Sequence, residues 1–353
     1  MNDAMLYDVL SQLCDIPGPS GAEAAVRESL IERWSGLVQE VVVDRVGNLL
    51  VKVGGNGPKV VIQAHMDEIG FVVRAITDDG FLLLDTAQGP RRASPDRRYF
   101  IGQNAQVIGR EGVVASGIFA AASGHVMTQA QVDKAHLGFE DMFVDIGASS
   151  RGEAIGLGVH VGAPVIWHRP VQRIGRLLSG KAMDDRMPLA LMDVVLHTVD
   201  VTKLGCELWF AATIQEENGL HGARALAVRG DFDMVLALDV GLTGDVPTVG
   251  MREYDAKLGG GPTLVHKDAA IQYDRRILWH CVDLAQKAGI PVQHGVYANY
   301  GSDGASFIGA GIPALLIGIP TRYTHTAFEA VDPADLWATI RLLQAFINEP
   351  PAL

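Results

Sequence analysis

The sequence predicts an α/β fold with a mixed central sheet covered by helices, into which a small all-β, barrel-like domain is inserted. Two observations predict it. In the first and last parts of the chain, β-rich runs and helical periodicity occur together, which is typical of a sheet with helices on both faces. Between Gly70 and Pro164, short β-like runs alternate with glycine and polar turns, and helical periodicity is nearly absent. We therefore expect one domain from residues 1–69 and 165–353, and an inserted domain at 70–164.

The elements of the first part are two helices followed by three strands. The helices are expected over Met5–Cys14 and Ala22–Trp34, separated by a Pro-Gly-Pro-Ser-Gly break. The strands are expected over Gln39–Asp44, Asn48–Val53 and Lys59–Gln63. The run Gly-Gly-Asn-Gly-Pro at 54–58 predicts a hairpin between the last two strands.

The inserted region carries only short β-like runs that are separated by turns. They lie at Phe71–Ile76, Phe81–Asp85, Asn104–Ile108, Gly112–Ile118 and Met142–Asp145. After Pro164, strands again alternate with helices. Helices are expected over Arg186–Val199, Leu220–Val228, Ala269–Ala288, Asp303–Ile308 and Pro333–Ile347. The strands between them are expected over Cys206–Ile214, Met234–Leu238, Val292–Tyr297 and Ile312–Ile317.

Composition excludes several classes of function. The formal net charge is -12, whereas nucleic-acid binding needs a positive surface. The longest apolar runs are too short for a membrane span, and the start of the chain has acids but no basic region typical of a signal peptide. The three cysteines, Cys14, Cys206 and Cys281, are widely spaced and form no disulfide framework. These features predict a cytoplasmic protein that binds neither nucleic acid nor membrane.

Five short segments place acids or histidines just beyond predicted strands, where open α/β sheets bind ligands. The segments contain His65 with Asp67, Asp184-Asp185, Glu216-Glu217, Asp239, and His325. Together they form a set of two histidines and several carboxylates without thiolates, which suits Zn²⁺, Co²⁺ or Mn²⁺. The number of acids exceeds the needs of one ion. A carboxylate that bridges two ions roughly 3.5–4 Å apart would account for it.

Each segment alone also has a plainer interpretation. His65 and Asp67 lie two apart in an extended chain, so Asp67 can accept the second ring N–H of a metal-bound His65, yet a core histidine beside a surface turn explains this motif slightly better. Asp184-Asp185 precedes a helix, where one acid would serve as an N-cap. Glu216-Glu217 would be a solvated strand end, although two carboxylates after a buried strand are costly unless a cation or a shared proton accompanies them.

At these residues the sequence resembles the tetrahedral aminopeptidases, which are relatives of the glutamyl and deblocking aminopeptidases and of proteins labelled as endoglucanases. The resemblance covers nearly the whole chain, and its motifs occur in the family's order and spacing. They are Ala64–Gly70 (AHMDEIG), Gly180–Arg186 (GKAMDDR), Gln215–Glu217 (QEE), Leu238–Val240 (LDV) and Thr324–Thr326 (THT). The family's peptidase fold carries a β-domain after the first metal ligand, in agreement with the change in pattern at Gly70.

The resemblance implies two divalent metal ions per subunit, most simply Zn²⁺. His65 and Asp239 would hold one ion, and Glu217 and His325 would hold the other. Asp184 would bridge both ions.

The same resemblance implies three further features of the site. The peptide bond from Asp184 to Asp185 would be cis, Asp67 would orient His65, and Glu216 would be the general base that takes a proton from the metal-bridging water. The activity implied is the removal of N-terminal residues from short peptides, because the free α-amine of the substrate would bind one metal. An aspartate at 239 supports this, since a glutamate at that place tends to accompany carboxypeptidases and deacylases in related two-metal hydrolases.

The resemblance also implies an assembly. Residues 1–69 and 165–353 would form the peptidase domain, and 70–164 would form a dimerisation and assembly domain. Relatives assemble from dimers into dodecameric tetrahedra with inward-facing active sites, so a homo-oligomer acting on short or unfolded peptides is expected.

The sequence departs from the family pattern at two places, and other functions stay open. Asp85–Gly102 is more basic than expected, and Gly260 stands where a lysine is common. These departures concern assembly contacts and substrate preference. They also suggest a branch of the family that is linked to the metabolism of osmoprotectant dipeptides. The alternatives are an N-acyl deacylase or carboxypeptidase with the same metals, and a non-catalytic scaffold, which would lack the base at Glu216. Endoglucanase activity is disfavoured because glycosidases use paired carboxylates without metal.

Overall fold

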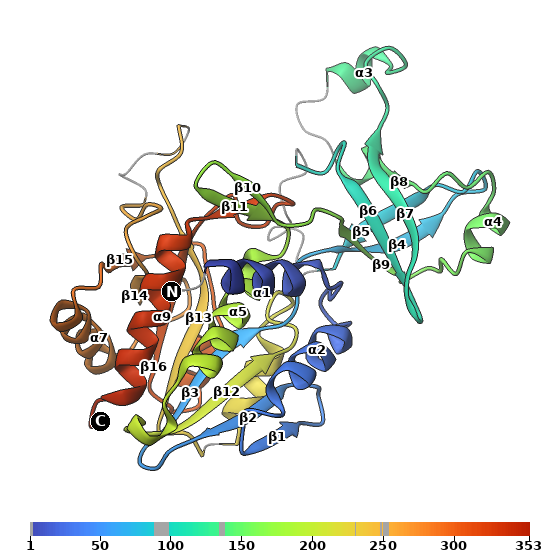
Figure 1. The fold of residues 1–353 in the computed structure, drawn as a ribbon. Coiled ribbons are helices and arrows are strands. Elements are labelled where there is room, and N and C mark those ends of the chain that lie inside the picture. The colour runs from blue at the N-terminus through green and yellow to red at the C-terminus, as the bar shows by residue number, and fades with distance from the viewer. Residues whose placement is uncertain (1–2, 88–98, 134–137, 230, 248, 250–253) are drawn as a thin grey trace.

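A mixed sheet passes through the larger part of the molecule, and a separate barrel lies beside it (Figure 1). The computed structural model describes residues 3–87, 99–133, 138–229, 231–247, 249 and 254–353. Within these ranges the sheet has 11 strands. Its main order is β1 (Glu40–Val43), β2 (Leu49–Gly54), β12 (Glu207–Thr213), β3 (Lys59–His65), β13 (Met234–Leu242), β16 (Ala314–Arg322), β17 (Glu329–Val331), β11 (Leu177–Gly180) and β10 (Gln172–Ile174). Two further strands lie off this path, β14 (Thr263–Lys267), which pairs with β16, and β15 (Gln293–Val296), which pairs with β14.

The centre of the sheet consists of four parallel strands in the order β12-β3-β13-β16. Their residues are almost entirely buried, as expected for parallel strands that are covered on both faces. Thr213 of β12 lies opposite His65 of β3, so these two strands end at the same edge of the sheet. The predicted site residues follow at this edge.

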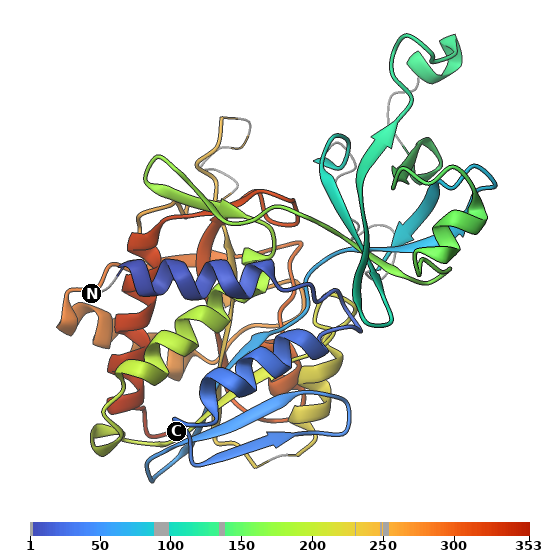
Figure 2. The same ribbon diagram turned by 45° about the vertical axis from the view of Figure 1, so that its right-hand side comes forward.

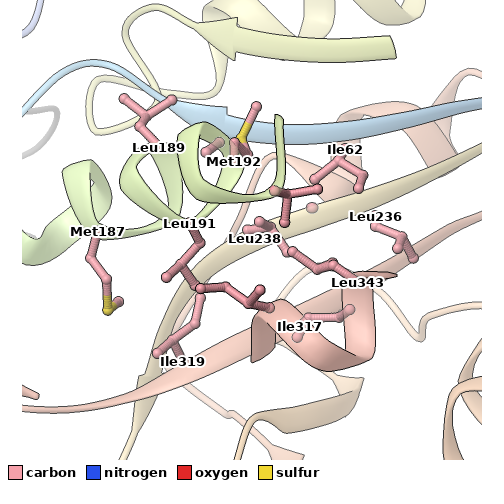
Figure 3. Close-up of a cluster of buried hydrophobic side chains, with 14 of the residues drawn as sticks. Ile62, Met187, Leu189, Leu191, Met192, Leu236, Leu238, Ile317, Ile319 and Leu343 are labelled. Carbon is pink, nitrogen blue, oxygen red and sulfur yellow. The ribbon is translucent and has the colours of Figure 1, made fainter. Parts of the chain in front are cut away.

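Helices cover both faces of the sheet. The larger hydrophobic core joins it to α1 (Asp3–Asp15), α2 (Ala24–Trp34), α5 (Met183–Thr198), α7 (Arg275–Ala288) and α9 (Pro333–Asn348). The smaller core joins it to α6 (His221–Ala227) and α8 (Gly304–Gly309). Helix α5 lies between the sheet, α1 and α9, and Figure 3 shows its apolar side chains beside those of β3, β13 and β16. This position explains why α5 is buried from Met183 to Leu196 and why most of its residues after Arg186 are apolar.

The inserted region forms a closed six-stranded barrel in the order β4-β5-β8-β7-β6-β9. Its strands are β4 (Phe71–Ile76), β5 (Leu82–Thr86), β6 (Asn104–Gly109), β7 (Gly112–Ala121), β8 (Met142–Asp145) and β9 (Pro164–Trp167). Phe71 packs edge-on against four aromatic rings inside it, those of Phe100, Phe119, Phe139 and Trp167. The barrel also carries the short helices α3 (Gln129–Val132) and α4 (Arg151–Gly156), and Figure 2 shows it beside the body. Its last strand ends three residues beyond the expected boundary at 164.

The predicted hairpin at 54–58 is wrong. Strands β2 and β3 do not pair with each other, because β12 lies between them, antiparallel to β2 and parallel to β3. Instead, Gly55 and Gly57 allow their segment to lie close to the backbone of residues 205–206. A Cβ at Gly55, whose φ is +81°, would lie 2.1 Å from the carbonyl oxygen of Cys206, just before β12 begins.

Other differences concern element boundaries. Helix α7 begins at Arg275 and not at Ala269, because Asp274 caps it by accepting a hydrogen bond from the Arg276 N–H at 2.8 Å. Strand β14 before this helix was not predicted, nor were the short strands β9, β10, β11 and β17. Among the described residues, no helix has both the length and the apolar character needed to cross a membrane.

Candidate metal centre

Three neighbouring parallel strands bring predicted site residues to one edge of the sheet. His65 is the last residue of β3, and Glu216 and Glu217 follow the end of β12 after two residues. Asp239 belongs to β13, which continues to Leu242 and does not end at Leu238 as expected. His65, Glu216 and Asp239 are buried, with exposed fractions of 1%, 8% and 3%.

Asp184 and His325 come from the other side of the site. Asp184 lies at the start of α5, directly after β11, and His325 lies in the loop between β16 and β17. One carboxylate oxygen of Asp184, Oδ1, is 3.0 Å from His65 Nε2, and the other, Oδ2, is 3.3 Å from His325 Nε2. His325 Nε2 is also 3.3 Å from Glu217 Oε1. Asp184 therefore stands between the two histidines, with one oxygen toward each.

The donor atoms fall into overlapping groups in which every atom lies within 4.8 Å of the others. One group contains His65, Asp184, Asp185 and Asp239, and another contains Asp184, Glu217 and His325. These groups contain the residues that the resemblance assigns to the two ions, with Asp184 in both and Asp185 as an additional member. A third group joins His65 to the Glu216-Glu217 pair. The peptide bond between Asp184 and Asp185 is cis, as expected.

Asp67 lies beside His65 and also contacts the Glu216-Glu217 turn. The nearest acceptor of the second ring nitrogen of His65 is the backbone oxygen of Asp67, 3.0 Å from Nδ1, whereas the Asp67 carboxylate is 3.4 Å away. That carboxylate accepts hydrogen bonds from the Glu216 N–H at 2.9 Å, the Glu217 N–H at 3.2 Å and the Ser20 hydroxyl at 2.6 Å. Asp67 thus contacts His65 through both its backbone oxygen and its carboxylate, and its side chain also fixes the Glu216-Glu217 turn.

Sequence reasoning missed two other buried groups around the site. Glu329 of β17 accepts backbone hydrogen bonds from Asp184 and His325. Glu68 forms a buried ion pair with Lys181, at 2.8 and 2.9 Å from its two carboxylate oxygens. Glu68 lies in the same motif as His65, and Lys181 lies in the same motif as Asp184. This closeness along the chain could have indicated that both residues are near the site. Glu329 lies in a short strand that no sequence pattern indicates.

The carboxyl groups of the site are crowded. Burial raises the pKa of Glu216 well above its usual value, and the neighbouring Asp239 and Glu217 add to this effect while His65 opposes it. Burial and the nearby Asp184 raise the pKa of Asp239 to about 7. Burial would also raise the pKa of Asp184, but the hydrogen bonds with His325 and His65 outweigh it and lower this pKa. Burial would lower the pKa of His65, but the surrounding carboxylates raise it well above its usual value.

These residues fit bound divalent cations. The donors are imidazole nitrogens and carboxylate oxygens, the ligands that Zn²⁺, Co²⁺ and Mn²⁺ accept. Asp185 Oδ1 is buried and accepts no hydrogen bond from the described residues, and a buried carboxylate oxygen without a partner is costly. A cation would satisfy this oxygen and relieve the repulsion among the acids.

Comparison with known proteins places the chain in a family. The model of the M42 glutamyl aminopeptidase family matches residues 47–342. The chain belongs to this family. The putative aminopeptidase FrvX of Escherichia coli is 31% identical over 347 residues, which cover 98% of this chain and 95% of FrvX. Membership in this metallopeptidase family makes the chain a metal-dependent aminopeptidase and implies that it uses divalent metal.

Solved structures agree with this assignment. An aminopeptidase from the archaeon Desulfurococcus kamchatkensis superposes with a TM-score of 0.91 at 30% identity, over 98% of this chain and 95% of that one. The TET1 peptidase of Pyrococcus horikoshii gives 0.87 at 29% identity, over 98% and 99% of the two chains, and is described as assembling into a tetrahedron or a large octahedral shell. The mixed sheet with an inserted barrel is therefore the fold of the tetrahedral aminopeptidases, as predicted.

The structure gives a physical account of one departure from the family pattern. A Cβ at Gly260 would lie 2.4 Å from the side chain of Gln293. Gln293 occupies this space because its amide bonds the backbone of Lys257 and of Gly261. A larger residue at 260 would displace Gln293. The other departure, Asp85–Gly102, lies mostly outside the described residues.

Proposed function

We propose that this M42 peptidase removes N-terminal residues from short peptides at a centre of two divalent ions, most simply Zn²⁺, with Co²⁺ or Mn²⁺ as alternatives. His65 and Asp239 would hold one ion, Glu217 and His325 would hold the other, and Asp184 would bridge them. The observation that carries this proposal is the position of Asp184, whose two oxygens lie 3.0 and 3.3 Å from the two different histidines. A carboxylate placed in this way is suited to two ions rather than one.

We propose Glu216 as the general base. Bound ions would supply an acidified water and a polarised scissile carbonyl. Glu216 would accept a proton from the attacking water at its carboxylate and pass it to the leaving amine. Its position and its environment support this role, because its Oε2 lies 4.0 Å from His65 Nε2 and burial raises its pKa well above the usual value. Asp67 fixes the base by accepting the hydrogen bond of the Glu216 N–H.

We propose that the barrel, predicted at 70–164 and extending to Trp167, mediates assembly of the subunits into a homo-oligomer such as a dodecamer. The assemblies described for the Pyrococcus horikoshii relative support this proposal. The barrel also exposes apolar side chains of the kind found at subunit contacts. They are Val113, Ile118, Val126, Ile155, Leu157 and Val161. The cytoplasmic location stays a prediction from the sequence.

The alternatives differ in the substrate end that they require. An N-acyl deacylase would release an acyl group from blocked amino acids, a carboxypeptidase would act at the other end of the peptide, and a dipeptidase of osmoprotectant metabolism would be inactive on longer peptides. Asp239 favours the aminopeptidase among these, through the resemblance described above.

The decisive experiment is hydrolysis of a panel of aminoacyl-4-nitroanilides by protein that is stripped of metal and then refilled with Zn²⁺, Co²⁺ or Mn²⁺. We expect metal-dependent release, which Glu216→Gln abolishes while the ions stay bound. Glu40→Gln, an exposed carboxylate on β1, is the matched control and should leave the rate unchanged. Release that persists undiminished in Glu216→Gln would refute the assignment of the base, and release only from N-blocked or C-terminal substrates would favour the alternatives.

A further inference from the structure

Glu329 is a buried carboxylate that the reaction does not use directly, yet it contacts two of the proposed metal-binding residues. Its side chain is almost fully enclosed, with an exposed fraction of 2%. Oε2 accepts a hydrogen bond from the Asp184 N–H at 3.0 Å, and Oε1 accepts one from the His325 N–H at 2.8 Å. Both oxygens are therefore occupied by backbone donors of residues that come from distant parts of the chain.

We propose that Glu329 is a positioning residue that sets up one of the two metal positions, the one formed by Asp184, Glu217 and His325. This inference rests on the proposed two-ion centre. It goes beyond that proposal because Glu329 is not among its ligands, and because it predicts that the two metal positions depend on different buried carboxylates.

The topology explains why this residue reaches both partners. Strand β17 lies between β16 and β11 in the sheet, and Glu329 pairs with Gly180, the last residue of β11. The chain leaves β11 at this point and reaches Asp184 four residues later. On the other side, the chain leaves β16 and forms the loop with His325 before it enters β17. A side chain at the start of β17 is thus next to both segments.

The backbone of His325 needs such support. His325 has a φ of +62° and Tyr323 one of +63°, a left-handed conformation that side-chain-bearing residues adopt only when their surroundings hold them there. The hydrogen bond from the His325 N–H to Glu329 is one such restraint, since it fixes the orientation of the peptide group next to the strained Cα. His325 is also partly exposed, so it has less packing than His65 to keep its ring in place.

The other metal position has its own support. The Asp185 carboxylate accepts the His65 N–H at 2.9 Å. The Asp67 carboxylate accepts the N–H groups of Glu216 and Glu217, so it supports the base and one ligand of the first position. Neither contact involves Glu329. Glu329 holds two ligands of the ion at Glu217 and His325, namely Asp184 and His325, but only the shared Asp184 of the other ion. Loss of Glu329 should therefore weaken the ion held by Glu217 and His325 more than the ion held by His65 and Asp239.

The sharpest variant is Glu329→Gln, which keeps the shape but offers one acceptor oxygen in place of two. Its NH₂ group would face either the Asp184 or the His325 N–H, so one of the two hydrogen bonds becomes a contact between two donors. The matched control is Asp335→Asn. Asp335 is also fully buried and accepts two backbone hydrogen bonds, from the Gly259 and Gly261 N–H groups at 2.7 Å each, but it touches no proposed ligand.

The test is a calorimetric titration of metal-free protein with Zn²⁺. Elemental analysis after dialysis counts the ions that stay bound, and thermal unfolding of the same samples reports on folding. We expect two ions in the wild type and in Asp335→Asn. In Glu329→Gln we expect the ion at His65 and Asp239 to lose less affinity than the other ion, which should bind 10- to 100-fold more weakly, the usual effect of losing a group that orients a metal ligand. Peptidase activity of Glu329→Gln should return as Zn²⁺ is raised, through kcat rather than KM, because a general loss of folding would not be rescued by metal.

The possible outcomes separate the two proposals. A wild type that binds fewer than two ions would overturn the two-ion centre itself. A wild type with two ions and a Glu329→Gln variant with the same two affinities would overturn the positioning role alone. Equal weakening of both ions, or equal weakening in Asp335→Asn, would also contradict it, because the effect would then be a general loosening of the fold.

Discussion

The buried ion pair between Lys181 and Glu68 should be a large contributor to stability, and Lys181→Met tests this. Lys181 Nζ lies 2.8 and 2.9 Å from the two carboxylate oxygens of Glu68, and each residue is only 1% exposed. Removing one partner of a buried pair leaves the other charge uncompensated, at a cost of about 3–5 kcal/mol. Glu68 keeps the Gly18 N–H at 3.1 Å and the Arg186 guanidinium at 3.7 Å, which places the expected loss near the lower limit, at about 3 kcal/mol.

This loss has a measurable size in a chain of 353 residues. At roughly 2.1 cal/mol/K per residue, the entropy of unfolding is about 0.7 kcal/mol/K, so a loss of 3 kcal/mol lowers the unfolding midpoint by about 4 °C. The assay is thermal unfolding of the metal-free protein at one protein concentration. The double variant Glu68→Gln with Lys181→Met removes both charges and should recover most of the loss. A midpoint shift below about 1 °C in Lys181→Met would refute the reasoning, because the pair would then contribute no more than a surface ion pair.

Three further changes have expected outcomes. Gly55→Ala should destabilise the fold by about 3 kcal/mol in urea unfolding, since the new Cβ would meet the Cys206 carbonyl oxygen at 2.1 Å at a φ of +81°, and an unchanged unfolding midpoint would contradict the close approach. Asp274→Ala should cost about 1 kcal/mol by the same measurement, because it removes the cap of α7, whereas Asp274→Ser should keep most of the stability. Burial raises the pKa of Asp303 from 3.8 to about 7, so its protonated form stabilises the metal-free protein at low pH, and this contribution is lost as the pH rises from about 4 to 7. Between pH 4 and pH 7, the free energy of unfolding of Asp303→Asn should therefore fall by up to about 4 kcal/mol less than that of the wild type. Identical pH profiles for the two proteins would disprove the shift in pKa.

Local sequence patterns determined the elements and the division into a sheet region and a barrel. Helices such as α9 and strands such as β3 and β12 follow from the spacing of apolar residues, because that spacing reflects the geometry of a single element. The same patterns place His65, Glu216 and Asp239 at or near strand ends, and the structure brings them to one edge of the sheet with Asp184 and His325. Their roles in binding metal and in catalysis stay predictions.

The pairing of distant segments was decided only by the tertiary structure. The run at 54–58 has the composition of a hairpin turn, but β12 separates β2 from β3, since the order of strands depends on contacts between residues more than 140 positions apart. Glu329 likewise has no distinguishing feature in the sequence. Its contacts arise because β17 lies in the folded sheet next to the segments that carry Asp184 and His325. The order of amino acids is enough to indicate which residues are suited to the chemistry, because ligand chemistry is a property of each side chain. Only the folded chain decided which buried carboxylates hold those residues in place, because a hydrogen bond to a backbone N–H depends on position in space and leaves no pattern along the sequence.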